Sequence, residues 1–183
     1  AWGDRQCGGD SSAVRDQLKG VQKIQAANYA FAAILGDGSV VTWGDGGYGG
    51  DSSAVRDQLK GVQQIQASIG AFAAILADGS IITWGDPFFG SDTSAVQDQL
   101  KGVMQIQAAS QAFAAILEDG SVVTWGRAKY GGDSSAVRDK LKGVQQIQAS
   151  HGAFAAILED GSVVTWGRED FGGDSSAVQD QLK

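Results

Sequence analysis

The feature that most constrains the fold of this chain is a repeat of constant length. Tryptophan recurs every 41 residues, at Trp2, Trp43, Trp84, Trp125 and Trp166. Counted from Gly20, the chain contains a half-unit, 1–19, followed by four complete units: 20–60, 61–101, 102–142 and 143–183. A fixed period of 20–50 residues is typical of solenoids, propellers and other arrays, whose units pack mainly on their neighbours. We therefore expect a single repeat domain over 1–183, with 1–19 as a half-unit cap.

Within one unit, the pattern predicts three strands. In unit 61–101, residues 62–68 alternate between apolar and Gln side chains, as expected for a strand with one wet face. Residues 71–77 are apolar on both faces, which predicts a strand covered on both sides. Asp78-Gly79 supplies the positive φ of a hairpin turn before the β-branched strand 80–85. These strands would form a meander.

A short helix is predicted to complete each unit. Asp51 stands at the expected N-cap of residues 52–60, and Val55 and Leu59 lie on one apolar stripe. Gly61 can then adopt a left-handed conformation and end the helix. A helix this short is unstable alone in water, so we expect it to dock on its sheet. The predicted unit is β-β-β-α.

Composition excludes several classes of partner. The chain has 14 basic and 21 acidic residues, a net charge of −7, which argues against binding nucleic acid or an anionic membrane. It has no secretory signal pattern and no apolar run near 18 residues, so we expect no membrane span. Cys7 is the only cysteine, and we expect no disulfide, metal or cofactor. Because the chain opens at Ala1 within a unit, we interpret it as an excised or built piece of an array.

The stretch "VQQIQASHGAFAAILEDGSVVTWG" at 144–167 resembles the RCC1-type repeat. The match rests on Val144, Ile147, the apolar strand at 154–158, Asp160-Gly161 and Trp166-Gly167, and it recurs in all four units. The resemblance implies a blade-like β unit. The chain departs from that family where Ala30, Ala71, Ala112 and Ala153 occupy the position of its usual histidine. A helix also replaces its fourth strand, and the period is shorter. Because only four units are present, we do not carry over the seven-bladed closure of that family. Its exchange-factor and chromatin activities are not carried over either, because no distinctive catalytic insertion is visible and the chain is acidic.

The expected fold class is mainly β with short helices, in a tandem array of β-β-β-α units. We favour an open solenoid or propeller-like stack, because the half-unit 1–19 duplicates what 165–183 already supplies. A closed four-bladed propeller is the alternative.

Few residues indicate chemistry. The tryptophans are expected to be core residues, and the lone His151 and Cys7 lack the partners of a catalytic or metal site. The "GGDSS" segments are explained by helix capping without a bound phosphate. No unit combines a base, a nucleophile and an orienting group, so we expect that the chain is not an enzyme.

Function is instead indicated by variation confined to two places in otherwise near-identical units. One region is the four residues that follow Trp-Gly in each unit. The other is the two residues just ahead of the apolar strand. Loops that vary on a constant frame are typical of recognition surfaces. The candidate partner-binding residues are Arg5, Gln6, Gly46, Tyr48, Pro87, Phe88, Arg127, Lys129, Arg168, Glu169, Tyr29, Ile69, Gln111 and His151.

We therefore predict a non-enzymatic repeat scaffold whose variable loops bind a protein or peptide. One alternative is a glycan-binding module that uses the loop aromatics as stacking platforms, and another is a built or excised piece with no ligand. Within the variable loop, the first two positions are predicted to lie at the surface. The third, held by Tyr48, Phe89, Tyr130 and Phe171, is predicted to be partly buried.

Overall fold

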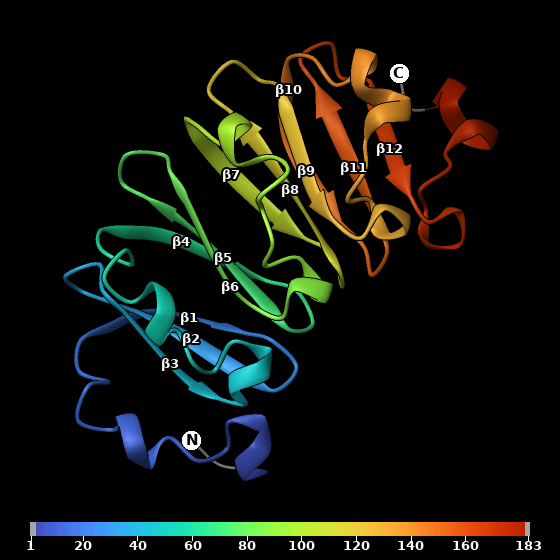
Figure 1. Ribbon diagram of the computed structural model, residues 1–183. Coiled ribbons are helices and arrows are strands. Elements are labelled where there is room, and N and C mark those ends of the chain that lie inside the picture. The colour runs from blue at the N-terminus through green and yellow to red at the C-terminus, as the bar shows by residue number, and fades with distance from the viewer. Residues whose placement is uncertain (1–2, 182–183) are drawn as a thin grey trace. The chain divides into compact units, whose positions relative to one another are not determined.

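The computed structural model describes residues 3–181 (Figure 1), and the chain divides into two units after Ser91. The first unit contains the 3-10 helices η1 (Arg5–Cys7), η2 (Ser12–Val14), η3 (Gly46–Tyr48), η4 (Ser53–Val55) and η5 (Pro87–Phe89). Its strands are β1 (Val21–Ala26), β2 (Ala30–Leu35), β3 (Val40–Gly44), β4 (Val62–Ala67), β5 (Ala71–Leu76) and β6 (Ile81–Gly85).

The second unit also contains two groups of three strands separated by a pair of 3-10 helices. Its 3-10 helices are η6 (Gln97–Gln99), η7 (Ala128–Tyr130), η8 (Ser135–Lys140), η9 (Glu169–Phe171) and η10 (Ser176–Gln181). Its strands are β7 (Val103–Ala108), β8 (Ala112–Leu117), β9 (Val122–Gly126), β10 (Val144–Ala149), β11 (Ala153–Leu158) and β12 (Val163–Gly167). No helix in the described part of the chain is long and apolar enough to span a membrane.

Each repeat forms one three-stranded antiparallel sheet in the order first, second, third strand. The predicted meander is therefore confirmed, with strand bounds within a residue or two of those expected from the sequence. A shift of register near the start of every first strand, as between Val62 and Gln64, marks a β-bulge. Among the described strands, β1 pairs only with β2 and β12 pairs only with β11, so each sheet ends as a separate three-stranded blade.

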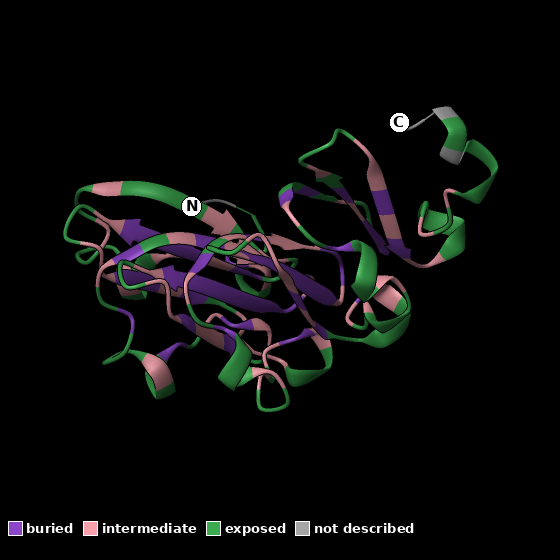
Figure 2. Cartoon of the chain, turned by 90° about the horizontal axis from the view of Figure 1, so that it is seen from above, coloured by how far each residue is buried: buried purple, intermediate pink, exposed green. Residues whose placement is uncertain are grey.

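The core lies between successive sheets within each unit. In the first unit, Ala32 and Ile34 of β2 pack with Ile65, Phe72 and Ala74 of the next sheet. The second strand of that sheet, β5, is buried from residue 71 to residue 75, as its apolar character on both faces predicted. Figure 2 shows the buried residues along the strands, whereas the loops and 3-10 helices are mostly exposed. The small alanine side chains of each second strand allow this close approach of the sheets.

The Asp-Gly hairpins form as predicted, although with longer loops. Gly79 has φ = +75° and its amide donates to the Leu76 carbonyl at 3.0 Å. The Asp78 carboxylate accepts hydrogen bonds from the Ser80 amide (3.0 Å) and hydroxyl (2.6 Å), and these bonds lower the pKa of Asp78. The loop between β5 and β6 therefore has four residues, 77–80, rather than two.

The prediction of an α-helix in each repeat is wrong. In the first unit, η4 is a single 3-10 turn in which Val55 N donates to Ser52 O at 3.0 Å. The Asp51 carboxylate accepts from Ser53 N at 2.9 Å, so it does satisfy a backbone amide, while Ser52 takes the N-cap position. Because the segment is short and begins with serines that favour local turns, α-helical bonds do not propagate along it. Gly61 is left-handed, as predicted, with φ = +67°.

Candidate functional site

The variable loops form a 3-10 turn of constant backbone, an element that the sequence reasoning missed. In the first unit, Asp45 and Asp86 cap these turns by accepting from the amides of Gly47 and Phe88, both at 2.8 Å. A left-handed glycine ends every turn, as at Gly49 with φ = +89°. The signal was present in the sequence as Asp followed four residues later by Gly, a pattern with an N-cap and a left-handed C-cap.

Within each unit, a tryptophan of one sheet holds the variable turn that precedes that sheet in place. Trp84 Nε1 donates to the carbonyl of Gly49 at 3.0 Å, and Trp166 Nε1 donates to Gly131 at the same distance. Both indole rings are buried and stack on a phenylalanine of the second strand, as in the pair formed by Phe72 and Trp84. The predicted core role of the tryptophans is confirmed for the described ones, and Trp2 lies outside the described residues.

A serine that the sequence reasoning did not single out also anchors two of the loops. Ser68 Oγ donates to the carbonyl of Phe89 at 2.8 Å, and Ser150 Oγ donates to that of Phe171 at 2.8 Å. The equivalent residues in the other repeats are Ala27 and Ala109, which have no hydroxyl. The alternation of Ser and Ala at this position was the available signal.

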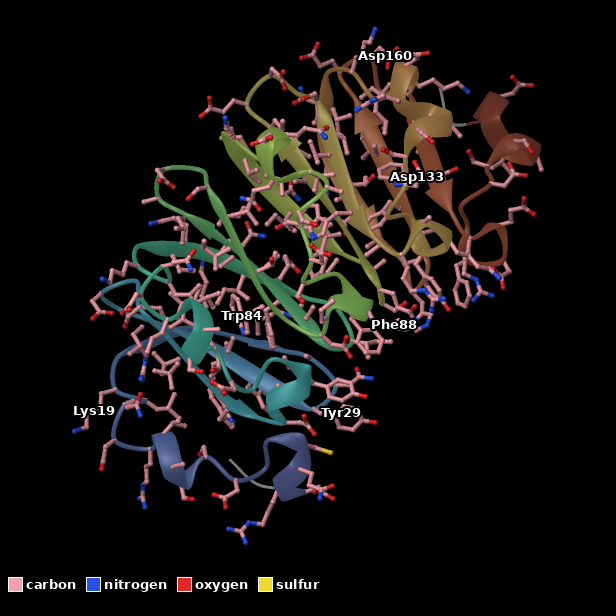
Figure 3. All side chains as sticks on the ribbon, in the orientation of Figure 1. Lys19, Tyr29, Trp84, Phe88, Asp133 and Asp160 are labelled. Carbon is pink, nitrogen blue, oxygen red and sulfur yellow. The ribbon has the colours of Figure 1, made fainter. Side chains whose placement is uncertain are left out.

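The first unit brings its two variable regions together into one row of aromatic rings, which we call the aromatic strip (Tyr29, Tyr48, Phe88, Phe89). Tyr29 meets Tyr48 edge-on at 4.7 Å between centroids, Tyr48 lies 5.8 Å from Phe89, and Phe89 lies 5.2 Å from Phe88. Tyr29 and Phe88 are labelled in Figure 3 and lie along the same edge of this unit. The strip therefore crosses from the loops of one sheet to those of the next.

Gly70 makes room for this strip. A Cβ at Gly70 would come within 2.6 Å of the Phe89 ring and 2.7 Å of the Tyr48 ring. Its neighbour Ile69 is half-buried, and the Ile69 carbonyl accepts from Asn28 N at 3.0 Å, which ties the two sheets together beneath the rings. Ile69 therefore contributes backbone rather than an exposed side chain.

In the second unit, the equivalent positions form a strip in which arginines alternate with rings, which we call the cationic strip (Arg127, Tyr130, Arg168, Phe171, His151). The Arg168 guanidinium lies 5.3 Å from the Tyr130 centroid and 4.7 Å from the Phe171 centroid. Arg127 lies 5.6 Å from the Tyr130 centroid, and His151 lies 5.1 Å from the Phe171 centroid. Cation–π contacts of this kind hold planar groups in a defined stack.

Hydrogen bonds fix the two arginines. Arg168 donates to Asp170 and, at 3.2 Å, to the Tyr130 hydroxyl, and these bonds raise the pKa of Arg168 above its usual value. Arg127 donates to Gln111 Oε1 at 2.8 Å, so the second variable region joins this strip too. The bond from Arg168 also lowers the pKa of the Asp170 carboxyl.

The remaining candidate residues are less closely joined. Arg5 pairs with Asp10 at 2.7 Å within the half-unit, and Gln6 is exposed beside it. The other exposed members are Gly46, Pro87, Lys129 and Glu169. Of the third loop positions, Tyr48, Phe89 and Tyr130 are half-buried as predicted, whereas Phe171 is exposed.

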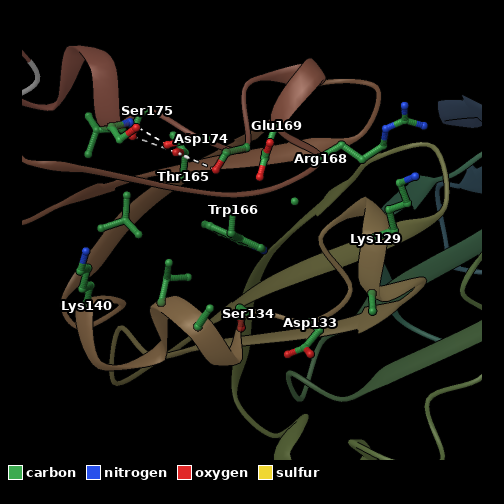
Figure 4. A pocket seen from close by; sticks show the side chains of 18 of the residues that line it. Lys129, Asp133, Ser134, Lys140, Thr165, Trp166, Arg168, Glu169, Asp174 and Ser175 are labelled. Carbon is green, nitrogen blue, oxygen red and sulfur yellow. Dashed lines mark hydrogen bonds between the residues drawn. The ribbon is translucent and has the colours of Figure 1, made fainter.

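A cleft of about 970 Å³ lies beside the cationic strip, between η7–η8 and the last strand (Figure 4). Trp166 lies within it, and Thr165 Oγ1 donates to Ser175 Oγ at 2.9 Å. Lys129 of η7 and Glu169 of η9 also line it, and Asp133 and Asp174 lie just ahead of η8 and η10. The carboxylates of the described residues do not gather into a metal-binding group. The cleft is thus a groove with both polar and apolar lining residues.

We predict different costs for truncating the two phenylalanines of one loop. Phe88 is 52% exposed and Phe89 is half-buried between rings. Phe88→Ala should lower the free energy of unfolding by no more than about 1 kcal/mol, and Phe89→Ala should lower it by about 2 kcal/mol, because only the latter opens a gap. Urea denaturation of the two variants provides the measurement, and a larger loss for Phe88→Ala would contradict the assignment.

Comparison with known proteins gives a match in structure alone. No family model and no curated protein matches the chain. Prp20p from Saccharomyces cerevisiae superposes with a TM-score of 0.60 at 18% identity, over 84% of this chain and 45% of that one. Human WBSCR16 gives 0.52 at 18% identity, over 84% and 50%. The CRINKLY WD40 ectodomain of the Arabidopsis thaliana receptor kinase ACR4 gives 0.53 at 18% identity, over 80% and 49%.

The chain thus spans half or less of the length of these structures, all at low identity. Prp20p is the yeast RCC1 protein, which agrees with the resemblance found in residues 144–167. Four antiparallel three-stranded sheets in tandem match the fold of those proteins. The chain has the fold of RCC1-type repeats, in a shortened form in which 3-10 turns replace the fourth strand of each blade.

Proposed function

We propose that this chain is a non-enzymatic scaffold that binds a protein or peptide through its aromatic and cationic strips. The observation that carries the proposal is that the two variable regions, separated by about half a repeat in sequence, form one strip within each unit. The register of β2 with β3 places both regions at one end of the sheet, and loops that vary on a constant frame are typical of recognition surfaces.

The chemistry of the strips favours a peptide over a carbohydrate. A sugar stacks on an open aromatic face, but Tyr29 meets Tyr48 at an interplanar angle of 69° and Phe88 meets Phe89 at 85°. Such edge-on rings leave gaps that suit apolar side chains, and aromatic residues together with arginine dominate protein interfaces. The cationic strip suits carboxylate groups, because a guanidinium recognises them through paired hydrogen bonds.

Structural neighbours support the same class of function. Prp20p binds Gsp1p and histones, and a second structure has yeast RCC1 bound to Kap60. Those partners belong to Prp20p, and they support protein binding here only as a property of the fold. We expect this chain to bind an extended segment with apolar and acidic side chains.

Selection from a random phage-displayed peptide library on the immobilised chain would test the proposal. Recovered peptides should bind the unmodified chain and should lose at least about tenfold in affinity for the Tyr29→Ser/Phe88→Ser or the Arg127→Ser/Arg168→Ser variant. The Met104→Ser variant is the matched control, because Met104 is 64% exposed and belongs to neither strip. A glycan array is probed with the same four proteins.

Two outcomes would overturn the proposal. Peptides that bind the strip variants and the unmodified chain equally would place recognition elsewhere. Glycan binding that is lost in the Tyr29→Ser/Phe88→Ser variant, without any peptide binding, would favour the lectin alternative. Thermal unfolding of each variant confirms that the loss does not arise from misfolding.

A further inference from the structure

The junctions inside the two units follow one rule. In the first unit, the face of β2 that carries Ile34 packs on the face of the next sheet that carries Ile65. In the second unit, the face of β8 that carries Ile116 packs on the next sheet at Ile147. A second-strand isoleucine of one sheet therefore meets a first-strand isoleucine of the following sheet at each interior junction.

Among the residues that the structure describes, two faces of the same kind have no such neighbour. We call them the Ile24 face (Gly20, Val21, Ile24) and the Ile157 face (Ala155, Ile157, Gly161). Ile24 is 57% exposed, whereas its equivalents Ile65 and Ile147 are 5% and 1% exposed. Ile157 is 41% exposed, whereas its equivalents Ile34 and Ile116 are each 6% exposed.

The glycines of the Asp-Gly hairpins show, independently of the isoleucines, that the last sheet has no neighbouring sheet on this face in the described part of the chain. A Cβ at Gly38 would lie 2.9 Å from the Cα of Gly61, and one at Gly120 would lie 3.1 Å from the Cα of Gly143. Backbone therefore meets backbone at both interior junctions. At Gly161, the equivalent position of the last sheet, nothing in the described part of the chain lies within 4 Å of an added Cβ.

We propose that the Ile157 face of one chain binds the Ile24 face of a second copy of this chain, head to tail. The occupant is identified by the repeat itself, because each interior junction shows what these residues bind: the matching face of another repeat. Val62 N donates to Gly38 O at 2.9 Å, and Val144 N donates to Gly120 O at 3.0 Å. By equivalence, Val21 N of the second copy donates to the carbonyl of Gly161.

Charge agrees with this arrangement. Asp160 precedes Gly161 on one face, and Lys19 precedes Gly20 on the other. Both side chains are exposed and are labelled on their respective units in Figure 3. The contact that brings Gly161 to Gly20 of the second copy places opposite charges at its edge, which favours this pairing over like-with-like pairing of two Ile24 faces.

A contact between two different faces has a distinctive consequence. A copy that joins uses one of its two faces and leaves the other free. Every complex therefore still has one free Ile24 face and one free Ile157 face, so association continues into a chain of copies or closes into a ring. A two-fold dimer, in contrast, would use one face twice and stop. The two cases respond differently to substitutions on each face.

Sedimentation velocity over a wide concentration range tests the proposal with the unmodified chain, the Ile24→Glu variant and the Ile157→Glu variant. The unmodified chain should form species larger than its 18.9 kDa monomer. Each variant alone should associate at least about tenfold more weakly, because a carboxylate would be buried without a partner. The Met104→Glu variant is the control, since Met104 is also exposed but lies on neither face, and it should associate like the unmodified chain.

An equimolar mixture of the two variants is the decisive measurement. Ile24→Glu retains an intact Ile157 face and Ile157→Glu retains an intact Ile24 face, so the mixture should recover a complex of two chains and no larger species. Failure of the mixture to associate, association of either variant alone at the unmodified strength, or an unmodified chain that stays monomeric would each overturn the proposal. Unchanged thermal unfolding of both variants at low concentration excludes misfolding as the cause.

Discussion

Gly85→Ala should unfold the first unit at far lower urea than the unmodified chain, with a loss of about 3–5 kcal/mol in the free energy of unfolding. Gly85 has φ = +104°, a conformation that L side chains rarely adopt. An added Cβ would also lie 2.5 Å from the Gly70 carbonyl oxygen and 2.9 Å from the Cα of Ala71. Both are backbone atoms of the paired segment, so neither can move aside without breaking the pairing of β5 with β6.

Gly61→Ala in the same unit separates the cost of a left-handed backbone from the cost of the steric contact. Gly61 also has a positive φ, +67°, but its added Cβ would meet only Ala77 Cβ at 3.7 Å, an ordinary contact. This variant should lose only about 1–2 kcal/mol, the cost of the left-handed backbone alone. Intrinsic tryptophan fluorescence, to which the buried Trp84 contributes, provides the measurement for both variants when it is followed through urea denaturation. Equal losses would show that the steric contact at Gly85 is relieved by movement.

Phe72→Ala should cost about 3–5 kcal/mol, as is usual for truncating a buried phenylalanine. Phe72 is fully buried, stacks on Trp84 at 5.1 Å, and belongs to the cluster between the first two sheets. Its removal would leave a cavity beneath the indole that holds the variable turn at Gly49. The loss of stability should therefore be accompanied by a change in the Trp84 environment.

Phe31→Ala is the matched variant for this prediction. Phe31 stacks on Trp43 in the same geometry, at 5.2 Å and 11° between planes, but it is only half-buried. Because the stacking is the same and only the coverage differs, Phe31→Ala should cost about half as much as Phe72→Ala. If the two variants unfold at the same urea concentration, the packing between sheets is not what stabilises Phe72.

Much of the fold was predictable because its determinants are local. Alternation of apolar residues predicted the strands, and the Asp78-Gly79 pair predicted a turn that the hydrogen bonds of Ser80 now explain. The helix prediction was wrong for a local reason as well. A capping Asp and a left-handed Gly are compatible with both an α-helix and a 3-10 turn, and a segment this short is not long enough for propensity to decide between them.

The candidate site was predicted in part. Variation between repeats identified the two loop regions, and the recurring aromatic residue identified the half-buried third position, as at Tyr48 and Phe89. That Tyr29 meets Tyr48, and that Gln111 meets Arg127, did not follow from the sequence. Each pair is well separated along the chain, and the distance between its members in space depends on how the sheet and its following turn are stacked.

The amino-acid sequence by itself thus determined the repeat, its strands and the residues that vary, because a period, an alternation and a turn signal act over a few residues. Only the tertiary structure decided which isoleucines are covered. Ile24 and Ile65 occupy the same position in closely similar local patterns, yet one is 57% and the other 5% exposed. Burial depends on whether another sheet lies opposite, and hydrophobic contact with a neighbouring repeat is non-directional and long-range in sequence, so no local pattern records it.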